Sequence, residues 1–355
     1  INAREAARAE AHLRAFWAAE AGLHHARALL GQDTNVLRQT SWLGVGTNLP
    51  YAFGVASNGV AADGGGQYVI TSTATVGAVS LVLRQTLSGR LWWRAFDYAL
   101  FGGGDDMEIM KLAIIRGSVF QYGDVRFVGS GSLITNGEVY ATGNVTPGYP
   151  VGELPESLPT MPTLDTSWYE TMIATAQASG LACPQLPDTN LWGGVLYVKG
   201  NLALGNLTGP GTVVASGDIS MWKELTAGSN VTIIAGGKIS LDKQCTFGTN
   251  CTMFAQTGFI LDKDGLLLQN CDLITPGNIT AKKDFVFSGL MYAGGKLDLQ
   301  KEATIVGCAV AGNGINIAKQ LDITYDATQF AASMPPGFVP EIVLTNIRWE
   351  QLPQE

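Results

Sequence analysis

Histidine is scarce in this sequence. The chain of 355 residues has only three, His12, His24 and His25, and all of them lie near its start. A nucleophile activated by histidine, or a zinc site built from histidines, therefore has no partner in the rest of the chain. Most hydrolytic mechanisms are excluded, and we expect no enzymatic activity, no cofactor and no metal site.

Cysteine is sparse as well. Five cysteines are too few for a disulfide scaffold at this length, and their odd number leaves at least one thiol unpaired. Cys251 and Cys271 occupy nearly the same place in successive repeats of the sequence described below. They could form a bridge or stack in reduced form as small core residues.

Charge and long apolar runs are limited too. Charged residues make up 15% of the chain, against about 25% in typical domains. The formal net charge of -8 and the pI near 5.0 exclude a generally basic nucleic-acid binder, so any such binding must use a local stripe. No apolar run is long enough to span a membrane. Because 46% of the residues are apolar, the chain folds.

The first 100 residues predict a helix followed by an antiparallel sheet. Residues 1–31 are rich in Ala, Leu, Arg and Glu, with Leu13, Phe16 and Leu23 at helical spacing, which indicates an amphipathic helix. A Gly-rich and Asn-rich connection runs to about residue 66. The β-branched alternation of residues 67–88, broken near Gly77, then predicts a hairpin.

A repeat begins near residue 117 and predicts a β-solenoid. A small-x-Gly-x-aliphatic element recurs with a step of about 19 residues, which is typical of one solenoid turn of three short strands. We expect the glycine to supply a positive φ at a corner and the aliphatic residue two places on to point inward. The marker glycines are Gly123, Gly143, Gly200, Gly217, Gly237, Gly258, Gly277 and Gly295, and Asn313 takes the same place in the last turn.

A proline-rich segment at about 147–190 interrupts the repeat. The 57 residues from Gly143 to Gly200 equal three turns of 19, but the intervening stretch is proline-rich, so we expect a loop and a helix on the flank of the solenoid. Ser167 and Glu170 match a capping box, which predicts that this helix begins there and ends near Gly180.

The repeat fades after Tyr325, and the last residues alternate as a single strand. One strand alone is not stable, so we expect it to pair with the hairpin at 67–88. The predicted fold is α+β and mainly β. A discontinuous domain of residues 1–100 and 336–355 holds the helix and the sheet, and residues 101–335 form an inserted β-solenoid.

Several segments carry a family resemblance: AFWAAEAGLHHARALL, YVITSTATVGAVSLVLRQTL, FDYALFGGGD, NGEVYATGNV and IRWEQLP. In this order they resemble minor pilins of type IV pili, and more narrowly the competence-associated minor pilins in which a β-solenoid is inserted into the pilin sheet. The resemblance implies a place at the pilus tip on the cell surface. It also implies capture of extracellular double-stranded DNA, without sequence specificity, during natural transformation.

The resemblance further implies contacts with other pilin subunits through the N-terminal helix. This sequence departs from the family at its start, where the apolar half of the pilin helix, its processing site and its early glutamate are missing. The resemblance therefore implies a native chain that continues into a membrane-inserted helix with a methylated mature N-terminus. That segment would anchor the protein in the inner membrane before assembly.

A recurring lysine is the main candidate for DNA binding. It stands six residues after the marker position in five turns and five residues after it in one, so we expect a row of about 24 Å along the stacked turns. Such a row suits DNA phosphates. The predicted residues are Lys223, Lys243, Lys263, Lys283, Lys301 and Lys319, and Lys282 widens the row. Alternatively, these lysines keep the corner soluble, and the acids beside them, such as Asp242, Asp264 and Asp284, neutralise them.

The arginines Arg84, Arg90 and Arg94 are a second candidate. Trp92, Trp93, Phe96 and Tyr98 are interleaved with them and could stack on exposed bases, but a buried seam between sheet and solenoid is the alternative. Two other functions stay open. One is an adhesion or carbohydrate-binding protein that uses the aromatics Trp168, Tyr169 and Trp192, and the other is a structural pilin that initiates or caps the fibre without a ligand.

Overall fold

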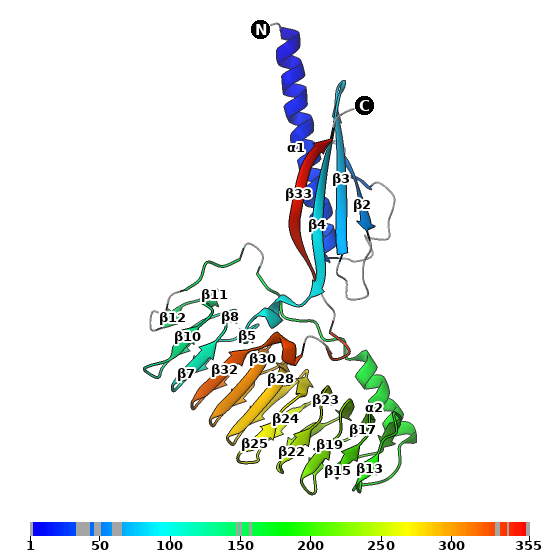
Figure 1. The fold of residues 1–355 in the computed structure, drawn as a ribbon, viewed down its shortest axis with the longest axis vertical. Helices are drawn as coiled ribbons and strands as arrows, with labels where there is room; N and C mark the ends of the chain where they lie inside the picture. Colours follow the sequence, from blue (N-terminus) through cyan, green and yellow to red (C-terminus); the bar gives the residue numbers. More distant parts are fainter. Residues whose placement is uncertain are drawn as a thin grey trace. The chain divides into compact units, whose positions relative to one another are not determined.

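The computed structural model describes residues 3–32, 43–45, 51–58, 66–146, 149, 151–155, 158–330, 334–338 and 341–352. The chain divides into two compact units (Figure 1). Residues 1–93 and 340–355 form the helix-sheet unit, and residues 94–339 form the solenoid unit. The division falls before residue 100 because β5 (Leu100–Gly102) already pairs with a solenoid strand.

Helix α1 (Ala3–Gln32) confirms the predicted N-terminal helix. Its buried side is mostly alanine, at positions Ala15, Ala18, Ala19 and Ala26, so the helix backbone packs close to the sheet. The predicted apolar stripe is only partly right, because Leu13 is 56% exposed. In the described part of the chain, no helix combines the length and apolar character that a membrane crossing requires.

The sheet of this unit has five antiparallel strands in the order β1, β2, β3, β4, β33. Their bounds are Leu43–Val45, Tyr51–Asn58, Gly66–Val76, Val79–Trp92 and Glu341–Leu352. β3 and β4 form the predicted hairpin, and Gly77 has the positive φ that its tight turn requires. The C-terminal strand β33 pairs with β4, as predicted. β1 and β2 lie in the stretch that we expected to be a connection only.

The solenoid unit confirms the predicted β-solenoid and has three faces of short strands that pair in parallel. The open face has ten strands. In spatial order they are β15 (Leu202–Leu204), β18 (Ile219–Met221), β21 (Lys238–Leu241), β24 (Gly258–Leu261), β27 (Asn278–Ala281), β29 (Leu297–Leu299), β31 (Ile315–Ile317), β6 (Met107–Ile109), β9 (Val125–Phe127) and β12 (Val145–Thr146).

The second face is covered by helix α2 (Ser167–Ser179) and the segment before it, and we call it the helix-covered face. Its strands are β14 (Val195–Val198), β17 (Gly211–Ala215), β20 (Val231–Ala235), β23 (Cys251–Ala255), β26 (Cys271–Thr275), β28 (Phe285–Ala293), β30 (Ala303–Ala311), β5, β8 (Val119–Gln121) and β11 (Val139–Ala141).

The third face completes each turn. It consists of β13 (Thr189–Asn190), β16 (Leu207–Thr208), β19 (Leu225–Ala227), β22 (Cys245–Phe247), β25 (Leu266–Leu268), the first halves of β28 and β30, β32 (Leu321–Tyr325), β7 (Ala113–Arg116) and β10 (Leu133–Thr135). Two 3-10 turns, Arg94–Asp97 and Ala327–Gln329, flank the solenoid in the chain. The aliphatic residue two places after the marker glycine points inward in most turns, as Ile219 and Ile239 show. Gly258 is the exception, because Phe259 takes the inward position and Ile260 lies beside the outward Ser240.

The turns are not stacked in sequence order. β32 pairs with β7 and β31 pairs with β6, so the first turn of the chain lies on the last one (Figure 1). The chain enters in the middle of the solenoid and winds to one end by Thr146. It reappears at the other end, where Leu181 bridges Val198, and winds back. The predicted interruption of the solenoid by a loop and a helix is confirmed, but the turns before and after it lie at opposite ends of the stack.

The segment between these ends crosses the helix-covered face. Tyr122 and Tyr292, both on that face, donate hydrogen bonds to the carbonyl oxygens of Pro159 (2.9 Å) and Pro162 (2.9 Å). The Tyr169 ring of α2 stacks on Phe254 with 3.8 Å between the ring centroids. The segment thus closes one face of the solenoid and leaves the corner between the other two faces uncovered.

The start of α2 differs from the predicted capping box. The helix begins at Ser167 and ends before Gly180, as expected. However, the Ser167 amide donates to Oδ1 of Asp165 (2.9 Å), and Glu170 accepts a bond from the Thr166 hydroxyl (2.7 Å). The N-cap is therefore Thr166, one residue before the predicted one, and the side chain that accepts from the first helical amide belongs to Asp165.

The role of the marker glycines also needs a correction. Of the eight, only Gly123, Gly200 and Gly258 have a positive φ. At Gly277 the reason is space, because a Cβ there would collide with the carbonyl oxygen of Thr257 in the neighbouring turn. The Asx residue that often follows the glycine accepts a backbone bond from the next turn, as Asn278 Oδ1 does from the Lys296 amide (2.7 Å). The marker therefore serves close stacking more than backbone conformation.

Candidate polyanion interface on the lysine corner

The corner between the open face and the third face carries a straight row of lysines. Each of the six predicted lysines stands two residues after the last residue of an open-face strand, and the strand register aligns those last residues. Leu241 pairs with Leu261, which places Lys243 beside Lys263. The predicted alignment is therefore present in the structure.

A seventh lysine extends this row. Ile317 pairs with Ile109 where the first turn lies on the last, so Lys111 takes the place next to Lys319. Sequence reasoning missed Lys111 because it follows residues in chain order, whereas the stack does not. The similar segments around Ile109–Lys111 and Ile317–Lys319 are the signal that could have revealed it. We define the lysine row as Lys223, Lys243, Lys263, Lys283, Lys301, Lys319 and Lys111.

The row has a definite length and two ends. Seven positions separated by about 4.8 Å give a row of about 29 Å. At one end the next register position is Asn206, and at the other it is Gly129. Asp188 lies one turn beyond Asn206, whose amide donates a hydrogen bond of 3.0 Å to Oδ1 of Asp188. The row is thus a finite cationic segment within a longer corner.

Most of the row faces solvent. Each lysine lies between the last residue of one strand and the first residue of the next, and both of these strand residues are buried. Leu241 and Cys245, on either side of Lys243, are an example. The lysine between them therefore points away from the core. The exposed members are Lys111, Lys243, Lys283, Lys301 and Lys319, whereas Lys223 and Lys263 are half-buried.

Ion pairs neutralise only part of this corner. Lys223 Nζ lies 2.6 Å from Oδ1 of Asp188 and 4.9 Å from the ring centroid of Trp222, and this lysine holds the pKa of Asp188 below its usual value. Lys282, the predicted flanking residue, is 3.5 Å from Oδ2 of Asp262. Lys263 Nζ donates to the carbonyl oxygen of Asp264 (2.8 Å).

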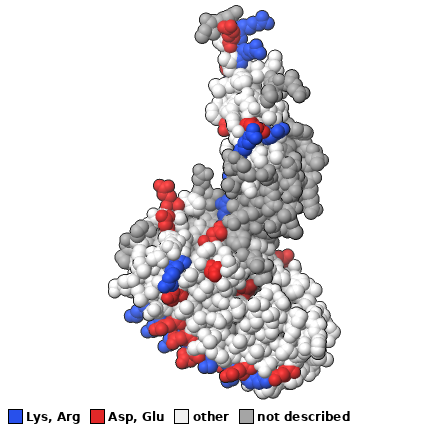
Figure 2. All heavy atoms as spheres, viewed as in Figure 1, with Lys and Arg blue, Asp and Glu red and all other residues white. Residues whose placement is uncertain are grey.

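The other five row lysines form no ion pair within 4.0 Å with any residue that the structure describes. Acids nevertheless stand close to them in the chain, and Figure 2 shows basic and acidic side chains alternating along the lower edge of the solenoid. The neighbouring acids are Glu224, Asp242, Asp262, Asp264, Asp284 and Glu302. The corner is therefore a cationic row between acidic flanks, with only a small net positive charge.

The second candidate, the arginine group, is not brought together within one unit. Arg84 belongs to the helix-sheet unit, where its Nη1 lies 3.6 Å from Oε1 of Glu350. Arg94 begins the solenoid unit in the 3-10 turn Arg94–Asp97, and Phe96 beside it is fully buried. The side chain of Arg90 lies outside the described residues. Neither unit presents these three arginines as one surface.

The residues expected for adhesion are split in the same way. Tyr169 is fully buried against Phe254, so it does not contact a ligand. Trp168 is 40% exposed, and Trp192 is 84% exposed at a positive φ of 53°.

The five cysteines are free, and Cys251 lies directly beside Cys271 in the register, which favours the stacked, reduced alternative. Within the described ranges, no group of metal-ligating side chains is arranged to hold an ion.

A helix packed on an antiparallel sheet whose last strand follows an inserted β-solenoid is the arrangement that the resemblance to minor pilins implied. No known family matches the sequence, and no curated protein matches it. Among solved structures, the chain is similar to the competence-associated pilin ComZ from Thermus thermophilus, with 13% identity and a TM-score of 0.31 over 96% of this chain and 97% of that one. It is also similar to an ice binding protein from an Antarctic biological consortium, with 11% identity and a TM-score of 0.27 over 66% of this chain and 90% of that one.

Proposed function

We propose that this chain is a minor pilin at the tip of a type IV pilus that captures extracellular double-stranded DNA through the lysine row. The single observation that carries the proposal is the strand register, which aligns seven lysines from separate turns on one edge of the solenoid. The order of helix, hairpin, inserted solenoid and returning strand supports the pilin assignment. Both parts go beyond the weak structural likeness to ComZ.

The dimensions of the row suit a DNA backbone. Duplex DNA carries one negative charge per about 1.7 Å of helix axis, so a row of about 29 Å faces more phosphates than it has lysines. The long, flexible lysine stems can adjust to phosphates that do not match the spacing of the turns. Contacts to phosphates alone carry no sequence information, so we expect binding without sequence preference.

The flanking acids set the expected strength. Lys223 is already paired with Asp188, and Lys263 is bound to a backbone carbonyl, which leaves five lysines free of such partners among the described residues. If about five phosphates are met, the slope of log K against log salt is about -4 to -5.

A fluorescence-anisotropy titration with a labelled duplex of arbitrary sequence tests this proposal. We expect the triple variant Lys243→Gln, Lys283→Gln and Lys301→Gln to lose most of its affinity at moderate salt. The matched control removes three lysines from the opposite edge of the open face, at Lys199, Lys238 and Lys296, and retains most of its affinity. Equal losses of affinity in the two triple variants would contradict the proposal. Unchanged affinity in the lysine-row variant would also contradict it and would favour binding through the arginine group.

A structural role in the fibre is compatible with DNA capture and rests on a separate surface. Leu13 and Trp17 of α1 are 56% and 60% exposed, and they supply apolar contact area for neighbouring pilin subunits. A chain that assembles through α1 but binds no DNA at low salt would support the purely structural alternative.

A further inference from the structure

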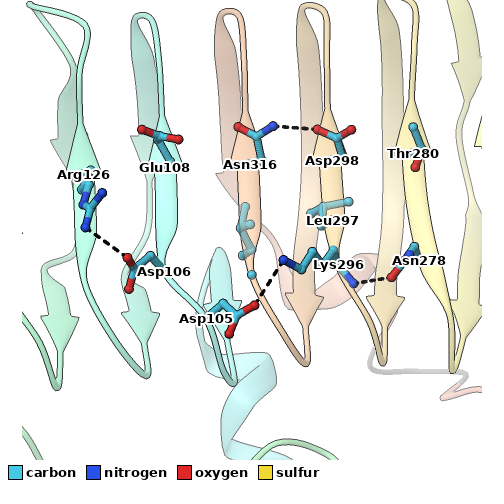
Figure 3. Close-up of a pocket in the computed structure, with 12 residues that line it drawn as sticks. Asp105, Asp106, Glu108, Arg126, Asn278, Thr280, Lys296, Leu297, Asp298 and Asn316 are labelled. Atoms are coloured by element: carbon cyan, nitrogen blue, oxygen red, sulfur yellow. Dashed lines mark hydrogen bonds and ion pairs between the residues drawn. The ribbon is translucent and has the colours of Figure 1, made fainter.

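A groove of about 530 Å³ lies on the open face, away from the lysine row. It crosses β27, β29, β31, β6 and β9, at the place where the first turn of the chain is stacked on the last (Figure 3). Thr280, Asp298, Asn316 and Glu108 form one row of outward side chains across four of these strands. We call this the open-face groove.

One extra residue builds the wall of the groove. Three residues separate Ala311 from Ile315, but four separate their register partners Gly102 and Met107. The longer corner pushes Asp105 outward over the face, where its Oδ2 lies 3.2 Å from Nζ of Lys296. The groove therefore lies at the junction where the corner is one residue longer.

Internal hydrogen bonds hold the polar floor in place. Asn316 Nδ2 donates to Oδ1 of Asp298 (2.8 Å), and Gln300 Nε2 donates to the other oxygen, Oδ2 (2.8 Å). At the far side, Arg126 Nη2 lies 3.3 Å from Oδ2 of Asp106. Each oxygen of Asp298 keeps a free acceptor position, so the fixed groups can still bind a ligand.

Glu108 differs from these groups, because its carboxylate makes no hydrogen bond or ion pair with the residues that the structure describes. Its side chain is half-buried. A carboxylate held in a groove without a partner is an acceptor for a ligand that can donate hydrogen bonds.

The composition of the lining selects the ligand class. Four acids, Asp105, Asp106, Glu108 and Asp298, outnumber the two cations Arg126 and Lys296, so the groove repels polyanions such as DNA. The residues two positions before the row of outward side chains, Asn278, Lys296 and Asp106, line the groove as well and form a second row about 6.6 Å from the first. A sugar ring presents hydroxyls on both of its edges, and each hydroxyl both donates and accepts.

We propose that the open-face groove binds a neutral, polyhydroxylated ligand, a short stretch of a polysaccharide chain that lies across the strands. No aromatic ring lines the groove, so the binding rests on hydrogen bonds. This proposal does not depend on DNA capture, because the lysine row and the groove share no residue.

Saturation-transfer NMR with three neutral hexasaccharides, of maltose, cellulose and chitin type, tests the proposal, with polygalacturonate as the anionic comparison. We expect at least one neutral hexasaccharide to bind and polygalacturonate to give no signal. The double variant Asp298→Ala and Asn316→Ala should weaken binding by about 10-fold or more, because two fixed hydrogen-bonding groups are lost.

The matched control is Ser220→Ala with Ser240→Ala, two outward residues of the same face outside the groove, which should leave binding unchanged. Thermal unfolding checks that all variants are folded. Failure of all three neutral sugars to bind the folded protein at about 10 mM, where even a Kd of about 1 mM is detectable, would overturn the proposal. Equal binding by the groove variant and the control would also overturn it.

Discussion

The helix-covered face and the open face of the solenoid are built from the same turns, yet the first is buried under a helix and the second is exposed to solvent. On the helix-covered face several outward side chains are large and apolar, and Phe254 and Ile274 are fully buried although they lie outside the interior core. On the open face most outward positions are small or polar, such as Ser240, Thr280 and Asn316. One face therefore contributes stability, and the other leaves its edge and its surface available for ligands.

The largest difference between the faces should be seen in stability. We expect Tyr169→Ala to lower the free energy of unfolding by about 3–5 kcal/mol, because it removes a buried ring that stacks on Phe254. Urea unfolding followed by circular dichroism measures the loss. The neighbouring Trp168 is 40% exposed, so Trp168→Ala should cost much less. Similar losses in the two variants would show that the helix does not seal this face.

Asp272 provides a second test, because it is an acid buried beneath the cover. It accepts a hydrogen bond from the Leu290 amide (2.7 Å), but desolvation raises its pKa to about 7. The folded state then holds a proton that the unfolded state has released between about pH 4 and pH 7. Stability therefore falls as the pH rises through this window, by up to about 4 kcal/mol for a shift of this size.

Replacing this acid should remove the pH dependence. In the variant Asp272→Asn, thermal unfolding should depend less on pH than in the parent chain, and the variant should be the more stable of the two at about pH 8. The same slope in both proteins would mean that Asp272 is not enclosed as the structure has it.

Smaller effects are expected at the lysine corner. Lys243→Gln should weaken DNA binding by about 3- to 5-fold at moderate salt, the loss of roughly one phosphate contact. Lys223→Gln should have a smaller effect, because this ammonium is already paired with Asp188. The comparison uses the same labelled duplex for both variants. An equal or larger loss for Lys223→Gln would show that its ion pair opens to bind DNA.

Much of this architecture could be predicted from the sequence, because local patterns determine it. Three patterns in the sequence reflect which side chains are buried and which are exposed. They are the helical spacing at the start, the alternation in the hairpin and the last strand, and the step of about 19 residues. The alignment of the six predicted lysines follows from the same step.

The order of the turns could not be predicted in this way. Which turn lies on which is decided by pairing between residues far apart in the chain, such as Ile317 with Ile109, and no local period records it. Lys111 and the open-face groove both arise at that junction, so both escaped sequence reasoning. The burial of Asp272 could not be predicted for a related reason, because Tyr169, which lies close to it in the structure, is far from it in the sequence.

The salt dependence of DNA binding tests the role of the lysine row most directly. For the native chain, the slope of log K against log salt should be about -4 to -5, and each free lysine replaced by glutamine should reduce its magnitude by about 0.9. Lys111→Gln should produce this step although Lys111 lies far from Lys319 in the sequence. A slope that stays constant as Lys111, Lys243, Lys283, Lys301 and Lys319 are replaced would show that DNA is bound elsewhere or not at all.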